Sequence, residues 1–164
     1  VHADDATLDA LAPQCDLLTW GYSGHPDNSR GHFNTAHLQR FHEHGFALWG
    51  GTACKGADGH NVDLPDPAQR SLNAQGWMDI ARRFGYAGVI ATAWSRYSTH
   101  RVQCEPIDAA LDVLLLCAVI LHDGEPPAGG LAACVEALGG FGERECFEAC
   151  RSAAAAELKR RASL

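Results

Sequence analysis

The sequence has few basic residues, and only its last residues hold a dense basic run. Its 164 residues include 13 Lys and Arg against 20 Asp and Glu, which gives a formal net charge of −7. Nucleic-acid phosphates are bound by clustered cations. The one basic run, residues 159–161, stands where it complements the negative end of an expected final helix. The composition therefore argues against a nucleic-acid partner.

The sequence also lacks a long apolar segment. Its longest apolar run, residues 111–121, is shorter than the roughly 20 residues that a bilayer span requires. Asp108 and His122 flank this run, and Asp112 stands at its start. The first residues carry charge where a signal peptide would be apolar, so we expect no signal peptide. The sequence predicts no membrane partner, and the run is expected to form a buried helix.

Motifs for metal and nucleotide sites are missing as well. The seven cysteines include no CxxC pair. Cys146 and Cys150 are either a metal-ligand pair or, as we favour, small apolar side chains that fill space in a core. The cysteine content fits a reducing, cytoplasmic setting best. His37, His42 and His44 are not spaced for one helical face, so we interpret them as surface residues. No P-loop or GxSxG motif occurs, nor a GxGxxG motif in the right setting. We expect no cofactor and no metal.

The sequence does contain an alternation of short apolar runs and helical segments. Strands are expected at residues 15–20, 46–49 and 88–94, with a shortened one at residues 1–3. Between them, Thr35 caps a helix that Gly45 closes, and Asp66 with Pro67 begins a helix that Gly85 ends. The helices expected after the last strand are 106–121, 131–138 and 143–161, with a Pro/Gly loop at 124–130.

This order predicts an α/β protein built from parallel βα units. The units repeat every roughly 30 to 40 residues, which suits a TIM (β/α)₈ barrel of about 250 residues, and four units are half of one. A flavodoxin-like open sheet is the alternative, but no glycine-rich phosphate loop follows the first strand. We expect residues 1–125 to form a partial barrel and residues 126–164 a helical extension packed on it.

Three of the expected strands end in tryptophan: Trp20, Trp49 and Trp94. In a barrel these ends lie on the face that carries the active site. Indoles stack on the apolar faces of pyranose rings, and polar partners for sugar hydroxyls follow closely in the sequence. These partners are Tyr22, Lys55, Arg96 and Tyr97. Each indole alone is also compatible with a filled barrel interior, but three at equivalent ends favour a shared sugar pocket, whereas Trp77 lies on a helix face and is expected in the core.

The same segments resemble a known family. Residues 88–97, which read GVIATAWSRY, with Cys104 and Glu105, resemble the eighth strand of glycoside hydrolase family 20, in its hexosaminidase D-like branch. Residues 48–57, which read LWGGTACKGA, resemble that branch's seventh strand. Residues 16–22 are similar to its sixth strand, and residues 1–6 to its fifth. The resemblance covers residues 1 to about 124 and implies that the chain is the C-terminal half, about strands 5–8, of a β-N-acetylhexosaminidase barrel.

The resemblance implies a reaction and a catalytic pair. Family members release terminal β-linked N-acetylhexosamine with retention, and the substrate's own acetamido oxygen attacks the anomeric carbon. An Asp-Glu pair after the fourth strand assists that attack, so we expect the pair upstream of this chain and no catalytic residue within it. Asp4 and Asp5 do not replace the pair, because three strands follow them and the second residue is not Glu. A pocket-lining role is expected for Asp5.

The expected binding residues are divided by role. Trp94 forms a wall for the sugar and its acetamido methyl, and Arg96 and Glu105 either hold hydroxyls or form a structural ion pair. Tyr97 and Tyr22 either donate hydrogen bonds to the sugar or only pack at the edge of the site. The expected partner is a carbohydrate with a terminal N-acetylhexosamine. A non-catalytic sugar-binding protein and a remnant half-barrel that dimerises through exposed barrel edges remain alternatives.

Overall fold

The computed structural model describes residues 3–27, 35–55, 65–94 and 110–139, with the single residues 156 and 160. In chain order these ranges hold α1 (Asp5–Leu11), β1 (Leu17–Trp20), α2 (Thr35–Glu43), β2 (Leu48–Lys55), α3 (Pro67–Phe84), β3 (Gly88–Ala93), α4 (Leu111–Asp123) and α5 (Leu131–Ala137). Arg96, Tyr97, Glu105, Cys146 and Cys150 lie outside the described residues. So do residues 143–155, where most of the expected last helix falls.

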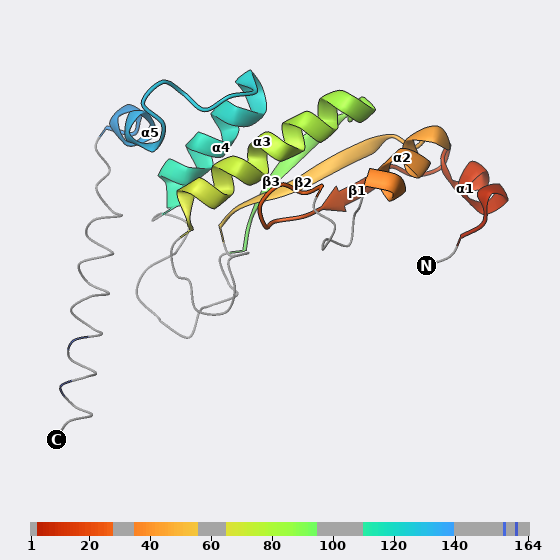
Figure 1. The fold of residues 1–164 in the computed structure, drawn as a ribbon, viewed down its shortest axis with the longest axis horizontal. Helices are drawn as coiled ribbons and strands as arrows, with labels where there is room; N and C mark the ends of the chain where they lie inside the picture. The colour runs from red at the N-terminus through yellow and green to blue at the C-terminus, as the bar shows by residue number, and fades with distance from the viewer. Residues whose placement is uncertain are drawn as a thin grey trace.

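The strands form a parallel sheet in the order β1-β2-β3. A helix connects each pair of consecutive strands, which is the βαβ arrangement that parallel pairing requires. Figure 1 shows α3 and α4 on one side of this sheet and α5 beside α4. The prediction of an α/β protein with parallel βα units is confirmed, and the described part is a small sheet of three strands with five helices.

The ends of α3 follow from its sequence. Asp66 accepts hydrogen bonds from the backbone N–H groups of Ala68 and Gln69, and Pro67 occupies the first helical position. Gly85 ends the helix in the left-handed region at φ 61°, where a residue without Cβ is favoured. The start and the end predicted for this helix are confirmed.

Trp77 of α3 lies at the centre of the first apolar core. Its side chain is fully buried, and its indole N–H donates to the carbonyl of Gly21 (2.9 Å). The other buried members of this core are Leu8, Leu38, Phe46, Leu48, Ile80 and Phe84. The core therefore joins α1, α2 and α3 to the helix-covered face of the sheet, and the stripe predicted for α3 is confirmed for Trp77, Ile80 and Phe84.

The second core lies between β2, α3, α4 and α5. Cys54, Cys117 and Cys134 are buried there among Ala74, Val113, Leu116 and Ile120. Burial raises the pKa of the Cys117 thiol to about 12. A neutral thiol of this kind packs as a small apolar side chain. These three cysteines thus contribute to packing, and α5 is attached to the sheet through α4.

The sequence predicted a strand at residues 46–49, with Trp49 at its end. This expectation is corrected, because Leu48 and Trp49 begin β2 instead of ending it. The strand begins at Leu48 and continues through Gly50 and Gly51 to Lys55. Glycine is required at these two strand positions because neighbouring atoms leave no room for a side chain. A Cβ on Gly50 would lie 2.7 Å from Cε3 of Trp77, and one on Gly51 would lie 2.9 Å from Cβ of Trp20. The sequence Gly-Gly marks close packing here and not a turn.

Substitution of Gly50 by alanine should lower the free energy of unfolding by about 1–3 kcal/mol, because the added methyl meets an indole that cannot move. Urea denaturation measures the loss. Gly21→Ala is the matched control, since its Cβ would meet the nearest atom, in Pro26, at an ordinary 3.6 Å. Equal losses for the two variants would contradict this packing.

The N-terminal residues also differ from the prediction. Residues 1 and 2 of the expected first strand lie outside the described residues, Ala3 is in no strand, and α1 begins at Asp5. Asp4 caps α1 by accepting a hydrogen bond from the backbone N–H of Thr7 (2.8 Å). Leu8 on its inner face joins the first core. A helix therefore occupies the segment in which Asp5 had been expected to end a strand.

Candidate functional site

One face of the sheet is free of described helices and exposes large apolar side chains. Successive residues of a strand point to opposite faces. Thr52 of β2 bonds to Asn73 of α3 (2.6 Å), which identifies the helix-covered face. The residues on the opposite face include Leu18 (42% exposed), Trp20 (52%) and Ile90 (45%), and Trp94 (46%) follows β3. Exposed apolar area gathered on one face is a feature of interaction sites.

At the carboxyl edge of the sheet, two aromatic rings meet across the middle strand. Tyr22 follows β1, Trp94 follows β3, and their ring centroids are 6.1 Å apart in an edge-to-face arrangement at 65°. The strands that carry them are separated by β2. The backbone N–H of Trp94 bonds to the carbonyl of Lys55, the last residue of β2. The two predicted site residues are therefore brought together, and Trp20 ends β1 two residues before Tyr22.

The loop that carries Tyr22 is fixed by α3. The Asn73 amide donates to the carbonyls of Gly21 (2.9 Å) and Gly24 (2.8 Å) on either side of Tyr22. The Trp77 indole donates to the same Gly21 carbonyl. A buried amide whose donors and acceptor are all engaged holds its partners in one geometry. Asn73 is thus a positioning residue that the sequence analysis missed, because a polar residue inside a helix gives no signal of its own.

The indole of Trp94 is also held in place. Its N–H donates to Oγ1 of Thr92 (3.1 Å), and the Thr92 hydroxyl donates to the backbone carbonyl of Thr52 on β2 (2.9 Å). This short chain of hydrogen bonds ties the ring edge to the sheet, while about half of the side chain stays exposed. The exposed part of the ring can therefore offer an apolar surface in a defined orientation.

Trp49 lies at the other end of the sheet. It is the second residue of β2 and pairs with Leu18 and Gly88. Its indole N–H donates to the carboxylate of Asp16 (2.8 Å), which precedes β1. Trp49 stands six positions before Lys55 in β2, a distance of about 20 Å along the strand. The expectation that three indoles share the carboxyl edge is therefore corrected: Trp94 stands beside the last residue of β2, Trp20 ends β1 beside Gly51 in the middle of β2, and Trp49 lies near the start of β2.

Lys55 is placed at the carboxyl edge but is fully buried. The pairing between β2 and β3 shifts by one residue between Ala53 and Lys55. An extra residue in one strand reverses the face on which the following side chain lies. Arg70 of α3, also buried, donates to the carbonyl of Ala53 (3.2 Å). Two cations therefore lie near the end of β2, and sequence analysis missed Arg70 because arginine on a helix is usually exposed.

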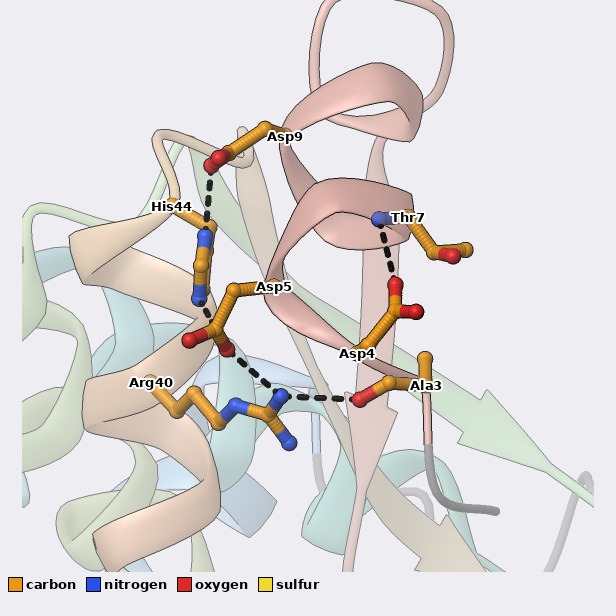
Figure 2. Close-up of polar contacts among 7 residues, drawn as sticks. All are labelled: Ala3, Asp4, Asp5, Thr7, Asp9, Arg40 and His44. Atoms are coloured by element: carbon orange, nitrogen blue, oxygen red, sulfur yellow. Dashed lines mark hydrogen bonds and ion pairs between the residues drawn. The ribbon is translucent and has the colours of Figure 1, made fainter.

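Asp5 is placed away from the aromatic pair. Its carboxylate contacts Arg40 of α2 (2.8 Å) and His44, which follows α2 (3.3 Å), as Figure 2 shows. His44 stands four residues before β2 begins, and Trp94 bonds to the last residue of that strand. The structure therefore places Asp5 near the amino-terminal end of β2. The hydrogen bond and charge of Arg40 hold the pKa of the Asp5 carboxyl below its ordinary value.

The described residues thus define an α/β domain whose parallel sheet carries an aromatic cluster at its carboxyl edge. We call the contacting pair Tyr22 and Trp94, together with Trp20 at the end of β1, the edge cluster. Arg96, Tyr97 and Glu105 follow Trp94 in sequence but lie outside the described residues. None of the helices in the described ranges is long and apolar enough to cross a membrane. Ligands of parallel α/β sheets bind outside the carboxyl ends of the strands, so the edge cluster stands where a ligand is expected.

Comparison with known proteins gives a partial match. No family model matches the chain. The chain is similar to human hexosaminidase D, with 28% identity over 125 residues, which are 74% of this chain and 25% of the human protein. It is also 28% identical over 127 residues to bovine hexosaminidase D, 74% of this chain and 36% of that protein. The chain therefore spans about a quarter to a third of the length of the curated relatives that it matches.

Proposed function

We propose that this chain is the sugar-binding part of a β-N-acetylhexosaminidase-like glycoside hydrolase of family 20. The observation that carries the proposal is the edge cluster, in which Tyr22 and Trp94 meet across the middle strand at the carboxyl edge of a parallel sheet. The partial similarity to hexosaminidase D supports a hexosaminidase-like segment and a carbohydrate substrate. In this proposal the sheet is the C-terminal half of a barrel and its helix-free face is the barrel interior.

The edge cluster can bind a pyranose ring by stacking. The apolar C–H face of the sugar covers the exposed face of Trp94, and the Tyr22 hydroxyl is free to exchange hydrogen bonds with ring substituents. The acetamido methyl adds apolar area, for which burial contributes about 25 cal/mol per Å². We propose Arg96, Tyr97 and Glu105 as the partners for hydroxyls, since charged groups give the stronger hydrogen bonds. The buried Lys55 and the distant Trp49 and Asp5 are not assigned to sugar contact.

The reaction that the resemblance implies needs more than this chain. In the family, the substrate's acetamido oxygen attacks the anomeric carbon while a Glu protonates the leaving oxygen and the preceding Asp orients the acetamido group. No Asp-Glu dipeptide occurs in the 164 residues. We therefore propose that the chain binds and orients the sugar and that the isolated chain does not cleave it. Sugar binding without cleavage is the second candidate function, and the same missing dipeptide favours it.

Calorimetric titration of the 164-residue chain with N-acetylglucosamine tests the proposal. We expect saturable binding, and weaker binding of glucose, which has the same ring but no acetamido group to pack against the indole. An aryl β-N-acetylglucosaminide should be bound without release of the aryl group. Equal heats for the two sugars, or no heat for either, would contradict a site for N-acetylhexosamine.

Thr92→Val should weaken sugar binding by about twofold to tenfold, the range expected for one hydrogen bond. The variant keeps the shape of the side chain but removes the acceptor for the Trp94 indole and the donor to Thr52. Thr92→Ser should restore binding because the hydroxyl returns. If Thr92→Val binds sugar like the unaltered protein, the hydrogen bond does not position the indole.

The two outer strands offer a route to a homodimer. Among the described residues, β1 and β3 are the edges of the sheet, and an open edge offers unpaired backbone groups to another chain. A homodimer formed through these edges stays a proposal.

A further inference from the structure

A histidine links the N-terminal helix to α2 through two carboxylates. His44 follows α2 and its side chain is only 15% exposed. Its Nδ1 lies 2.7 Å from Oδ1 of Asp9, and its Nε2 lies 3.3 Å from Oδ1 of Asp5; both aspartates belong to α1 (Figure 2). The imidazole is therefore bracketed by two acidic groups from one helix, which lies 35 residues earlier in the sequence.

This geometry requires a proton on each ring nitrogen. A neutral imidazole has one N–H and one lone pair, so only one of the two carboxylates can accept a hydrogen bond from it. The other carboxylate then faces a lone pair, which repels it. The imidazolium form has two N–H donors, so the Asp9 contact becomes a charge-assisted hydrogen bond and the Asp5 contact an ion pair. The arrangement is therefore complete only when His44 is protonated.

We propose that His44 is a proton-operated latch that holds α1 against α2. In the protonated state it joins Asp5 and Asp9, and loss of the proton opens at least one of the two contacts. Leu8, buried in the first core, keeps α1 attached while its polar side loosens. The attachment of α1 thus weakens in the pH range in which histidine titrates. The proposal concerns the described N-terminal segment and does not depend on sugar binding.

The other charged groups around His44 are accounted for. On α1, Asp4 is engaged as the helix cap with Thr7. Arg40 of α2 donates to Asp5 and to the carbonyl of Ala3, both at 2.8 Å. Glu43 accepts a hydrogen bond from Gln39, and His42 packs against Phe84 of α3, whose ring Arg83 covers.

The direction of the pH effect follows from the contacts. The Asp9 and Asp5 carboxylates raise the pKa of His44 above its ordinary value of 6.5, although partial burial acts against them. Its stabilising contribution is therefore fully present below pH 6.5 and is lost as the pH rises through the raised value. Arg40 lowers the pKa of Asp5 below 3.8, so the contribution of Asp5 is lost only as the pH falls through that lowered value. The latch is closed between about pH 4 and pH 6.5.

Amide hydrogen exchange of α1 in the 164-residue chain, expressed as protection factors, tests the latch. Between pH 5.5 and pH 8 we expect the protection of the Leu8 and Ala12 amides to fall by roughly twofold to fivefold, the factor that corresponds to exposed ion pairs. These amides bond to the carbonyls of Asp4 and Leu8. In His44→Gln the protection should be low and nearly constant over the same range, after correction for intrinsic exchange.

Two further variants keep the test decisive. Asp9→Asn should remove most of the pH dependence and lower the pKa of His44, which is read from its ring-proton NMR signal. His42→Gln is the matched control on the same helix and should retain the full pH dependence. The proposal is overturned if α1 protection is independent of pH in the unaltered chain, or if His44→Gln and the unaltered chain lose protection alike.

Discussion

Replacement of Trp77 by alanine should lower the free energy of unfolding by about 3–5 kcal/mol, the cost of removing a large aromatic side chain from a packed interior. Trp77 has no exposed area, and it contacts the backbone of β2 at Gly50, where a single added carbon would lie within 2.7 Å of its ring. The indole also donates the hydrogen bond that holds the carbonyl of Gly21. Its loss therefore leaves a cavity and leaves the Gly21 carbonyl with the Asn73 amide as its remaining donor.

Chemical denaturation followed by circular dichroism measures this loss. Trp94→Ala is the matched control in the same experiment, because about half of that side chain is already exposed and its removal leaves no closed cavity. We expect the control to lose less than about 1.5 kcal/mol, since its ring contact with Tyr22 is worth about 0.5–1.5 kcal/mol. Similar losses for the two tryptophan variants would contradict the assignment of Trp77 to the core and of Trp94 to the surface.

Trp94→Ala should instead reduce the affinity for N-acetylglucosamine at least about tenfold, which corresponds to about 1.4 kcal/mol of lost stacking. The ring stands at the carboxyl edge, fixed by Thr92 on its N–H side and by Tyr22 on its edge. The variant should remain folded by circular dichroism, so that weaker binding is attributable to the missing ring. Calorimetric titration measures the affinity.

Trp49→Phe is the control for this prediction. Trp49 is an aromatic residue of the same sheet, but it lies at the opposite end of β2 beside Gly88 and Asp16. Phenylalanine keeps an aromatic side chain at this position and gives up the hydrogen bond to Asp16 and part of the indole that packs against Gly88. Binding should therefore be unchanged. An equal loss of affinity in the two variants would show that a general change of the sheet, and not a local contact at the edge cluster, causes the effect.

The parts of the fold that depend on local chemistry could be predicted from the sequence. The Asp66 cap, Pro67 and Gly85 determine the ends of α3 by backbone hydrogen bonding and by a left-handed dihedral, which need only neighbouring residues. Gly124 likewise ends α4 at φ 89°. The strands β1 and β3 were predicted within two residues of their ends, because each is a compact apolar run between polar segments.

The parts of the fold that depend on tertiary contacts could not be predicted from the sequence. The expected strand ended at Trp49, and only tertiary contacts, of the Trp77 ring with Gly50 and of Trp20 Cβ with Gly51, explain why the strand continues through the two glycines. That error placed Trp49 at the wrong end of β2. His44 was interpreted as a surface residue because the spacing of His37, His42 and His44 places no pair on one helical face. Its partners Asp5 and Asp9 belong to a helix that had not been predicted.

The positions of some candidate site residues could be predicted from the sequence, whereas the residues that hold them could not. Trp20, Tyr22 and Trp94 follow from the rule that carboxyl ends of parallel strands meet at one edge, and the ring contact between Tyr22 and Trp94 agrees with it. The residues that position them, Asn73 and Thr92, were missed because their role is visible only in the hydrogen bonds they make to Gly21, Gly24 and Thr52.

The most direct test of the central claim is an NMR titration of the unaltered chain with N-acetylglucosamine that follows the indole N–H signals of its four tryptophans, assigned by single substitutions. The account predicts that the signals of Trp94 and Trp20 shift with one saturable curve, while those of Trp49 and Trp77 stay in place. A shift confined to Trp49, or no shift in any indole at saturating sugar, would contradict a sugar-binding cluster at the carboxyl edge.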